Sequence, residues 1–162
     1  MSPWRLALDK AFALTFRPAT PADVPALLAL RRATMGAHLE RANAPRDEAA
    51  LLARVNYRLE DALLVYEGEE LAGLFKVSRT PGEWKLIQVQ IAPHRQGQGL
   101  GGHLVRGLQA EAAAAGCAIV LDVLKDNPAR GLYERCGFVV VGETELEYEM
   151  RWRPRSAEAT KP

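Results

Sequence analysis

Residues 85–115, KLIQVQIAPHRQGQGLGGHLVRGLQAEAAAA, form the stretch around which the rest of the chain is organised. The stretch begins as an apolar run with β character, passes through a proline and a glycine cluster, and ends as an amphipathic helix. The glycines lie at positions 97, 99, 101 and 102. A helix start carries unpaired backbone N–H groups and the positive end of the helix dipole, and glycines let phosphates approach that backbone. The stretch therefore predicts a site for a pyrophosphate group.

Composition places the chain among ordinary globular domains. Its 162 residues are 48% hydrophobic and 25% charged, and we expect a single domain over 1–155 with a disordered tail over 156–162. A formal net charge of +1 gives no sign of a nucleic-acid partner. No apolar run approaches the roughly 18 residues that span a membrane, so we expect no membrane partner. Cys117 and Cys136 and the three histidines lack metal-ligand spacing, which predicts reduced cysteines, no metal and a cytoplasmic location.

Apolar periodicity predicts seven strands and several helices. The expected strands are 12–17, 62–66, 71–78, 84–91, 118–123, 138–141 and 145–152. The expected helices follow Thr20 and span 47–59, 100–115 and 127–135. One parallel β-α-β crossover joins strands 84–91 and 118–123 within an otherwise antiparallel pattern. The expected fold class is therefore α/β (α+β), a mixed, mostly antiparallel sheet of about seven strands with helices on both faces.

The glycine cluster by itself has more than one interpretation. Gly97, Gly99 and Gly102 match G-x-G-x-x-G, and Asp122 follows 20 residues later, as in a dinucleotide-binding fingerprint. Five residues separate the strand from the first glycine, however, and only 40 residues follow Asp122, too few for the doubly wound sheet of that fold. A P-loop is disfavoured because no Lys-Ser/Thr follows the glycines. A turn that only lets helix and sheet pack closely is the remaining alternative.

A second motif favours one interpretation. Residues 89–104, VQIAPHRQGQGLGGHL, resemble the signature of the GNAT superfamily of acyl-CoA-dependent N-acetyltransferases, in which Q/R-x-x-G-x-G/A opens a helix after a strand and a proline. Gln96, Gly99 and Gly101 carry that signature here. Residues 121–138, LDVLKDNPARGLYERCGF, resemble the second acyl-CoA motif of the family, and 16–30, FRPATPADVPALLAL, its usual opening. The resemblance extends over about 12–152, nearly the whole chain.

The resemblance implies acetyl-CoA as the co-substrate and assigns residues to it. The pyrophosphate is expected at the backbone of Gln96, Gly97, Gln98, Gly99, Leu100, Gly101 and Gly102. The pantetheine arm is expected to pair with the backbone of Val89, Gln90 and Ile91, where the family separates two parallel strands and frees N–H groups for the thioester carbonyl. Asn127 matches a residue that binds pantetheine or orders the site, and Tyr133 matches a general acid near the sulfur.

The acceptor amine needs a base. An alkyl amine with a pKa of about 10.4 lies about 4–5 kcal/mol from its neutral, nucleophilic form at pH 7. The family often supplies a Glu on one of the separated strands, but strand 84–91 offers only Gln88 and Gln90. Asp122 is therefore the preferred candidate for the base, and Glu83 is the second.

The predicted function is transfer of an acetyl group from acetyl-CoA to a primary amine by direct nucleophilic attack, without a covalent enzyme intermediate. The acceptor, a small molecule or a protein amine, is not identified, and families of this kind commonly form homodimers. One alternative is a catalytically weak acyl-CoA-binding sensor, which the absent Glu keeps open, and another is a dinucleotide-binding module. The resemblance implies an acceptor groove near the first two helices, where Met35, His38, Glu40 and Tyr57 are candidates for contact.

Overall fold

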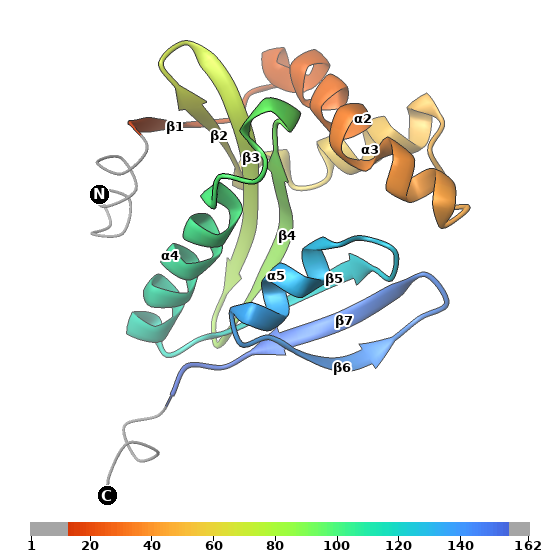
Figure 1. Cartoon of the computed structure of the whole chain (residues 1–162). Helices are drawn as coiled ribbons and strands as arrows, with labels where there is room; N and C mark the ends of the chain where they lie inside the picture. Colours follow the sequence, from red (N-terminus) through yellow and green to blue (C-terminus); the bar gives the residue numbers. More distant parts are fainter. Residues whose placement is uncertain (1–12, 156–162) are drawn as a thin grey trace, which may run out of the picture.

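A computed structural model describes residues 13–155 of the chain (Figure 1). Phe12, the expected start of the first strand, and the predicted tail over 156–162 lie outside these residues. The strands are β1 (Leu14–Pro18), β2 (Ala62–Glu67), β3 (Glu70–Thr80), β4 (Glu83–Ile91), β5 (Ala118–Leu124), β6 (Val139–Glu143) and β7 (Glu147–Trp152). The helices are α2 (Val24–Arg41), α3 (Glu48–Asn56), α4 (Leu100–Ala115) and α5 (Ala129–Arg135), with short 3-10 turns η1 (Pro21–Asp23), η2 (Leu59–Asp61) and η3 (Pro93–Arg95).

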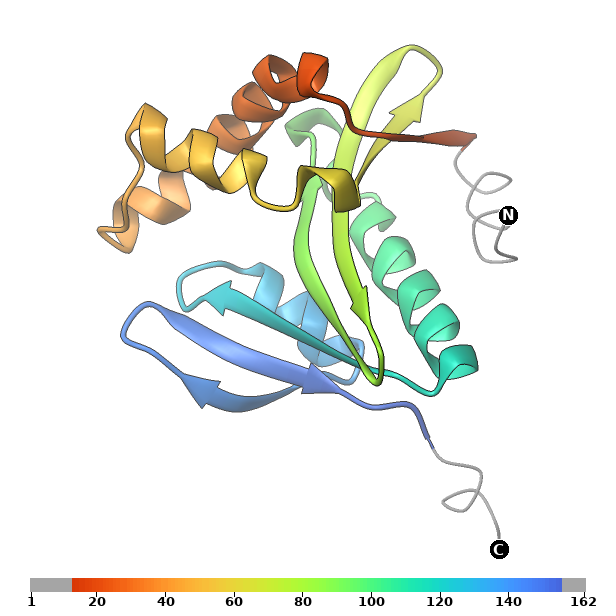
Figure 2. The same cartoon turned by 180° about the vertical axis from the view of Figure 1, so that it is seen from behind.

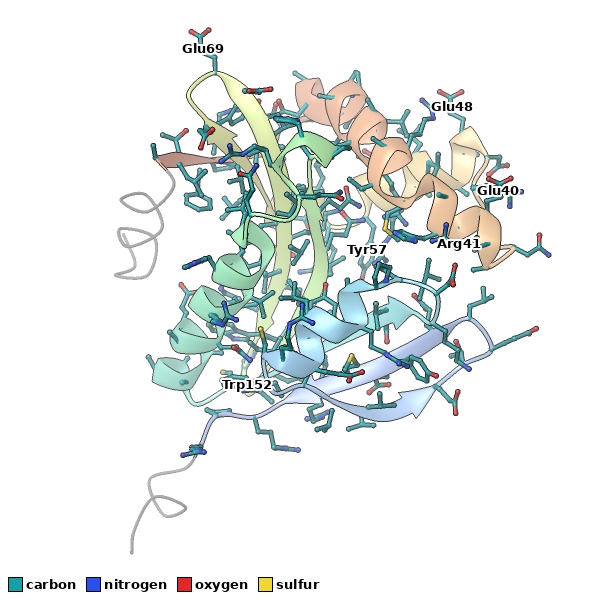
Figure 3. All side chains as sticks on the ribbon, in the orientation of Figure 1. Glu40, Arg41, Glu48, Tyr57, Glu69 and Trp152 are labelled. Carbon is teal, nitrogen blue, oxygen red and sulfur yellow. The ribbon has the colours of Figure 1, made fainter. Side chains whose placement is uncertain are left out.

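The strands form one seven-stranded sheet in the order β1-β2-β3-β4-β5-β7-β6. Every neighbouring pair is antiparallel except β4 and β5, which are parallel and joined through α4. The β2–β3 hairpin projects from this sheet, with Glu69 at its tip (Figure 3). The predicted fold class and the single parallel crossover are confirmed.

The parallel pair separates along its length. Register between β4 and β5 extends only over residues 83–85 and 118–120. Beyond it, 86–91 of β4 and 121–124 of β5 diverge, and the β5-β7-β6 half of the sheet turns away from β1–β4 (Figures 1 and 2). A strand edge without a neighbouring strand leaves N–H and C=O groups available to a ligand. The separation implied by the resemblance is present.

A bulge in β4 changes the face to which its side chains point. Lys76 of β3 lies opposite Gln88 and Val77 lies opposite Leu86, so that Ile87 is an extra residue in β4. Leu86 accordingly belongs to the core beneath α4 and only borders the hollow that Gln88 and Gln90 line with residues of α2 and α3. The bulge therefore directs two amide side chains toward the first two helices.

Two hydrophobic cores hold the helices on opposite faces of the sheet (Figures 1 and 2). The first contains the predicted stripe of α4, Leu100, Leu104, Leu108 and Ala112, together with strand residues such as Ile119. The second packs α2 and α3 against β2 and β3 through residues such as Leu27, Leu51 and Leu64. Burial of these apolar surfaces is the main term that fixes both helical layers.

A buried lysine on the face of the sheet that packs against α2 and α3 makes hydrogen bonds that hold α3 on the sheet. Lys76 of β3 is 0% exposed, and its Nζ donates hydrogen bonds to the carbonyl oxygens of Arg54 at 3.2 Å, Val55 at 3.1 Å and Tyr57 at 2.6 Å. These carbonyls belong to the end of α3, where the last C=O groups have no N–H partner within the helix. Burial, followed by the nearby Arg54 and Arg31 charges, lowers the pKa of Lys76 to about 8. Lys76 thus fixes the end of the helix that carries Arg54.

No helix among residues 13–155 is both long enough and apolar enough to cross a membrane. Cys117 and Cys136 are free thiols, as predicted.

Candidate active site

The start of α4 is built by glycines with left-handed backbone. Gly97 has a φ of 77° and Gly99, the N-cap of α4, a φ of 84°, a conformation that L side chains rarely adopt. A Cβ on Gly97 would meet nothing within 4 Å, so that this glycine is required by conformation and not by space. The Nε2 of Gln96 donates to the Ile91 carbonyl at 3.0 Å and holds the turn at the end of β4. The result is a helix start whose first backbone N–H groups have no partner within the helix.

A hollow of about 250 Å³ lies at this helix start, and we call it the glycine-loop hollow. It is lined by Ile91, Arg95, Gln96, Gly97, Gly99, Leu100, Gly101, Gly102, Leu132 and Arg135. Two arginines therefore accompany the helix dipole, and Arg95 is held by Glu67 at 2.5 Å. Backbone N–H groups, the dipole and guanidinium groups all favour an anion such as a diphosphate.

A second hollow, of about 220 Å³, continues from the first along the end of β4, and we call it the strand-end hollow. Ile91, Gln96, Gly101 and Leu132 line both. Asn127 and Tyr133 line its other side. The Asn127 Oδ1 accepts a hydrogen bond from the Ala129 N–H at 2.9 Å, which fixes the start of α5. The strand-end hollow thus runs beside the free edge of β4.

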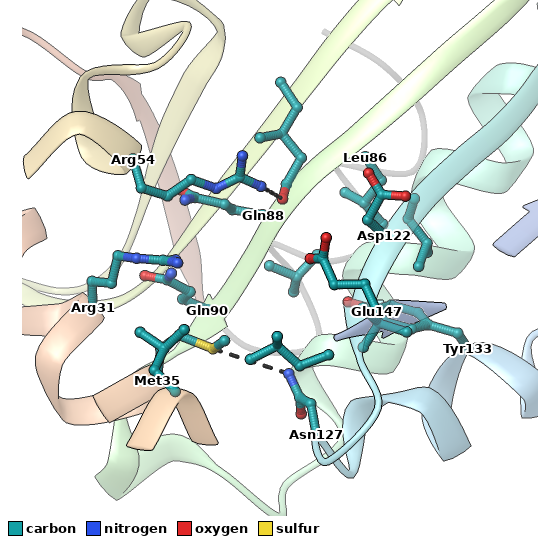
Figure 4. A pocket seen from close by; sticks show the side chains of 16 residues that line it. Arg31, Met35, Arg54, Leu86, Gln88, Gln90, Asp122, Asn127, Tyr133 and Glu147 are labelled. Carbon is teal, nitrogen blue, oxygen red and sulfur yellow. Dashed lines mark hydrogen bonds between the residues drawn. The ribbon is translucent and has the colours of Figure 1, made fainter. Parts of the chain in front are cut away.

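A third hollow, of about 110 Å³, lies where β4 and β5 diverge, and we call it the two-arginine hollow (Figure 4). It shares Met35, Val89, Gln90, Asn127 and Tyr133 with the strand-end hollow. The three hollows therefore form one path from the glycines to the gap between the separated strands. A ligand with a phosphate end and a reactive far end would fit such a path.

Charged groups face one another across the two-arginine hollow. Arg31 of α2 and Arg54 of α3 lie on one wall, and Asp122 of β5 and Glu147 of β7 on the other, with β4 between them (Figure 4). The Nη2 of Arg54 donates to the Ile87 carbonyl at 3.2 Å. Burial and the Arg54 charge lower the pKa of Arg31 to about 10, while Glu147 opposes the shift. Both arginines are cations at neutral pH.

Tyr133 stands where the second and third hollows meet. It is buried and packs edge-on against Phe138, with ring centroids 5.8 Å apart. Burial, and to a smaller extent Cys136, raises the pKa of its hydroxyl to about 12. The hydroxyl is therefore protonated throughout the range in which enzymes work, as a proton donor must be.

The two candidates for the base have different surroundings. Asp122 lines the two-arginine hollow, and its Oδ2 pairs with the Lys85 Nζ at 2.6 Å. Glu83 lines none of the three hollows and pairs with Arg151 at 2.7 Å, in the part of β4 that still contacts β5. The geometry keeps Asp122 at the site and separates Glu83 from it.

Most of the other predicted residues are brought together along the path. The predicted backbone segments of β4 and the glycine turn line the path, but Gln98 lines none of the three hollows, and its Nε2 contacts the His94 carbonyl at 3.5 Å. Of the candidates for acceptor contact, Met35 and His38 line the strand-end hollow. Glu40 points outward near the end of α2 and Tyr57 is 51% exposed, and neither lines a hollow (Figure 3).

Several site residues were missed by sequence reasoning. Arg31, Arg54 and Glu147 at the third hollow belong to no motif, whereas Arg95 and Arg135 at the first lie inside the two motif segments but were not singled out. Their places in the glycine signature and in the second motif are the signals that could have identified these two arginines. Among residues 13–155, no cluster of His, Cys, Asp and Glu could hold a metal ion.

Comparison with known proteins bears on this arrangement. Residues 26–138, well over half of the chain, match the model of the Acetyltransferase (GNAT) family. The chain belongs to this family, and the prediction of an N-acetyltransferase enzyme is confirmed at that level. A search of curated proteins by sequence found no match.

Solved structures agree on the fold. PaiA N-acetyltransferase from Thermoplasma acidophilum, in complex with coenzyme A, superposes with a TM-score of 0.68 at 16% identity, covering 86% of this chain and 98% of that one. The ribosomal-protein-S18-alanine N-acetyltransferase from Escherichia coli gives 0.65 at 20% identity, with 91% and 99% covered. An acetyltransferase from Thermus thermophilus gives 0.69 at 19% identity, with 86% and 96% covered. At these identities the likeness establishes the fold.

Proposed function

We propose that the protein transfers an acetyl group from acetyl-CoA to a primary amine of a small molecule or protein by direct attack. The observation that carries this proposal is the continuous path of three hollows from the glycine turn to the gap between β4 and β5. Such a path fits a ligand with a diphosphate at one end and a thioester at the other. The structure of a relative with coenzyme A bound supports the same ligand.

The residues along the path fit coenzyme A by their chemistry. The N–H groups at the start of α4, with Arg95 and Arg135, would hold the pyrophosphate. The free edge of β4 at residues 89–91 would pair with the amides of the pantetheine arm, and Asn127 would bind the same arm or order its surroundings. The residues present would thus satisfy both the charged and the amide parts of the ligand.

The reaction needs two proton transfers. The amine nitrogen forms a bond to the acetyl carbon, the carbon–sulfur bond breaks, nitrogen loses a proton and the sulfur gains one. Tyr133 is the proposed donor to sulfur, and Asp122 the proposed acceptor from nitrogen. Glu147 lines the same hollow and is a second candidate for the acceptor.

The test combines binding with turnover on the full chain. Thermal melting is measured with acetyl-CoA, CoA and NAD, and thiol release is then followed over a panel of amines. A ligand at 100 times its Kd adds about 2.7 kcal/mol, which raises Tm by roughly 5–10 °C for a chain of this size. A shift with acetyl-CoA together with thiol release supports the proposal. A shift without release on any amine favours the acyl-CoA sensor, and a shift with NAD alone favours the dinucleotide module.

The base is tested by two matched variants, Asp122→Asn and Glu147→Gln. The variant that removes the base is expected to lower kcat/KM by about 10²-fold or more and to abolish the fall in rate on the acid side of the pH profile. The other variant should retain that limb. If both retain it, neither carboxylate accepts the proton, and water carries it directly to solvent.

A further inference from the structure

The two-arginine hollow contains buried polar groups that the fold leaves unsatisfied. Gln88 is 7% exposed and Gln90 4% exposed, and both lie on β4 between the two walls of the hollow (Figure 4). The Nε2 and Oε1 of Gln88, the Oε1 of Gln90 and the Nε of Arg31 have no hydrogen-bond partner among residues 13–155. Unpaired buried polar atoms of this kind are costly, so a cluster of them around a cavity indicates a polar ligand.

Two guanidinium groups on one wall of the hollow indicate that one end of the ligand carries a negative charge. Arg31 and Arg54 line the hollow as two cations within a partly buried space, each lacking a carboxylate within ion-pair distance among the described residues. Their mutual effect is unfavourable, since the Arg54 charge contributes to the lowered pKa of Arg31. An anionic group between them would relieve this repulsion and accept hydrogen bonds from both guanidinium groups and from the Gln88 amide.

The opposite wall suits a cation. Glu147 makes no ion pair within 4 Å among residues 13–155, whereas Asp122 is paired with Lys85. Glu147 and Arg31 face each other across the hollow (Figure 4). The separation of charge within one small cavity therefore matches a zwitterion, with its anionic end toward α2 and α3 and its ammonium end toward β5 and β7.

We propose that the acceptor is an amino acid or a similar small molecule in which a carboxylate lies close to the amine, bound through Arg31 and Arg54. This assignment rests on the proposed acetyl transfer and names the acceptor class for it. With the carboxylate at the arginines, the amine lies toward Glu147, Asp122 and Tyr133, the side on which the hollow joins the proposed thioester path. The same wall disfavours polyamines and aminoglycosides, because two arginines repel a second positive charge.

The test compares three forms of each acceptor: the free L-amino acid, its carboxamide and the amine without the carboxyl group. Thiol release from acetyl-CoA is expected to give a kcat/KM for the acid about 100-fold above that for both analogues that lack the carboxylate. Arg31→Gln should remove this preference mainly by raising KM, while the Kd for CoA stays within roughly twofold. Arg32→Gln is the matched control, because Arg32 is adjacent in sequence but exposed and paired with Glu48 at 3.6 Å.

Each result decides the inference separately from the proposed function. Turnover of the carboxamide or the decarboxylated amine at the same rate as the acid overturns the inference and leaves acetyl transfer standing. Preference for peptides with a free N-terminus and a blocked C-terminus also overturns it, in favour of a protein substrate. Without any thiol release, acetyl transfer fails, and the inference is then decided by melting of the CoA-saturated protein: a Tm rise with amino acids that Arg31→Gln abolishes supports it, and no rise overturns it.

Discussion

At the scale of a single residue, the burial and position of Tyr133 suit the proton-donor role proposed for it. It is part of the core beneath α4 and also lines both the strand-end and the two-arginine hollows. Burial raises the pKa of its hydroxyl to about 12, so that the protonated form dominates at every working pH. A tyrosine at the surface would have the same proton but would not be held beside both hollows.

Tyr133→Phe is expected to lower kcat by about 10²-fold with little change in the Kd for CoA, because the ring is retained and only the proton donor is lost. In the parent enzyme, kcat should show no fall below about pH 10 that arises from Tyr133. The measurement is kcat from pH 6 to 9, with Tyr57→Phe as a control outside the hollows. Equal kcat values in the variant and the parent over this range would exclude the acid role.

At the scale of the element, glycines have two different roles at the start of α4. Gly97 and Gly99 supply left-handed backbone, whereas Gly101 has ordinary backbone and lines both the glycine-loop and strand-end hollows. A Cβ on Gly101 would lie 3.5 Å from Leu132 and 3.7 Å from Ile91, which are ordinary contacts. The fold therefore tolerates alanine at position 101. The added methyl group would instead reduce the space for a ligand in the two hollows.

Gly101→Ala is expected to weaken CoA binding by about tenfold or more while Tm in the absence of ligand stays the same or rises slightly, since alanine favours helix. Gly36→Ala in α2 is the matched control, because its Cβ would meet nothing within 4 Å and it lines none of the three hollows. Isothermal titration with CoA measures both. Unchanged CoA affinity in Gly101→Ala would contradict the placement of the pantetheine and phosphates along this helix start.

The end of α3 depends on Lys76. Lys76→Met is expected to lower the free energy of unfolding by about 1–3 kcal/mol at pH 7, because three carbonyls at the end of α3 lose their donor. The folded-state pKa of about 8 lies below the ordinary value of 10.5, so the unfolded chain binds more protons between these values. Stability of the parent should therefore rise from pH 8 to 10.5, and this contribution should be absent from the variant. Urea denaturation at several pH values measures it, and a constant difference between the two proteins would refute the linkage.

At the scale of the whole molecule, the proposed path joins parts of the chain that are far apart in sequence. β4 and α4 lie on one side of the gap between the two separated strands, and β5 and α5 lie on the other side (Figure 1). Bound CoA would bridge the two sides, so its stabilising effect should spread beyond the residues that it touches.

Hydrogen exchange with and without CoA measures this bridge. Amides of residues 89–102 and 127–133 are expected to gain the strongest protection, because they line the glycine-loop and strand-end hollows. β1 and β6, at the two edges of the sheet, should change least. Protection confined to the glycine turn would indicate that only a phosphate group binds.

Prediction from sequence succeeded where the physics is local. Turns such as that at Gly68, the end of α4 at Gly116 and the apolar stripe of α4 follow from backbone preference and periodicity, and the structure has all three. The glycine turn could also be located, because left-handed backbone and a helix start leave a local signal. Asp122 and Tyr133 were found only because they lie within recognisable motifs.

The sequence by itself determined the succession of strands and helices along the chain, the parallel crossover and the position of the glycine turn, because each depends on residues close together in the chain. The tertiary structure alone decided that Arg31, Arg54 and Glu147 share one hollow, since they come from α2, α3 and β7. It also decided, through the bulge at Ile87, that Gln88 and Gln90 face those helices. Contacts between distant segments are set by how whole elements pack, and spacing along the chain does not encode them.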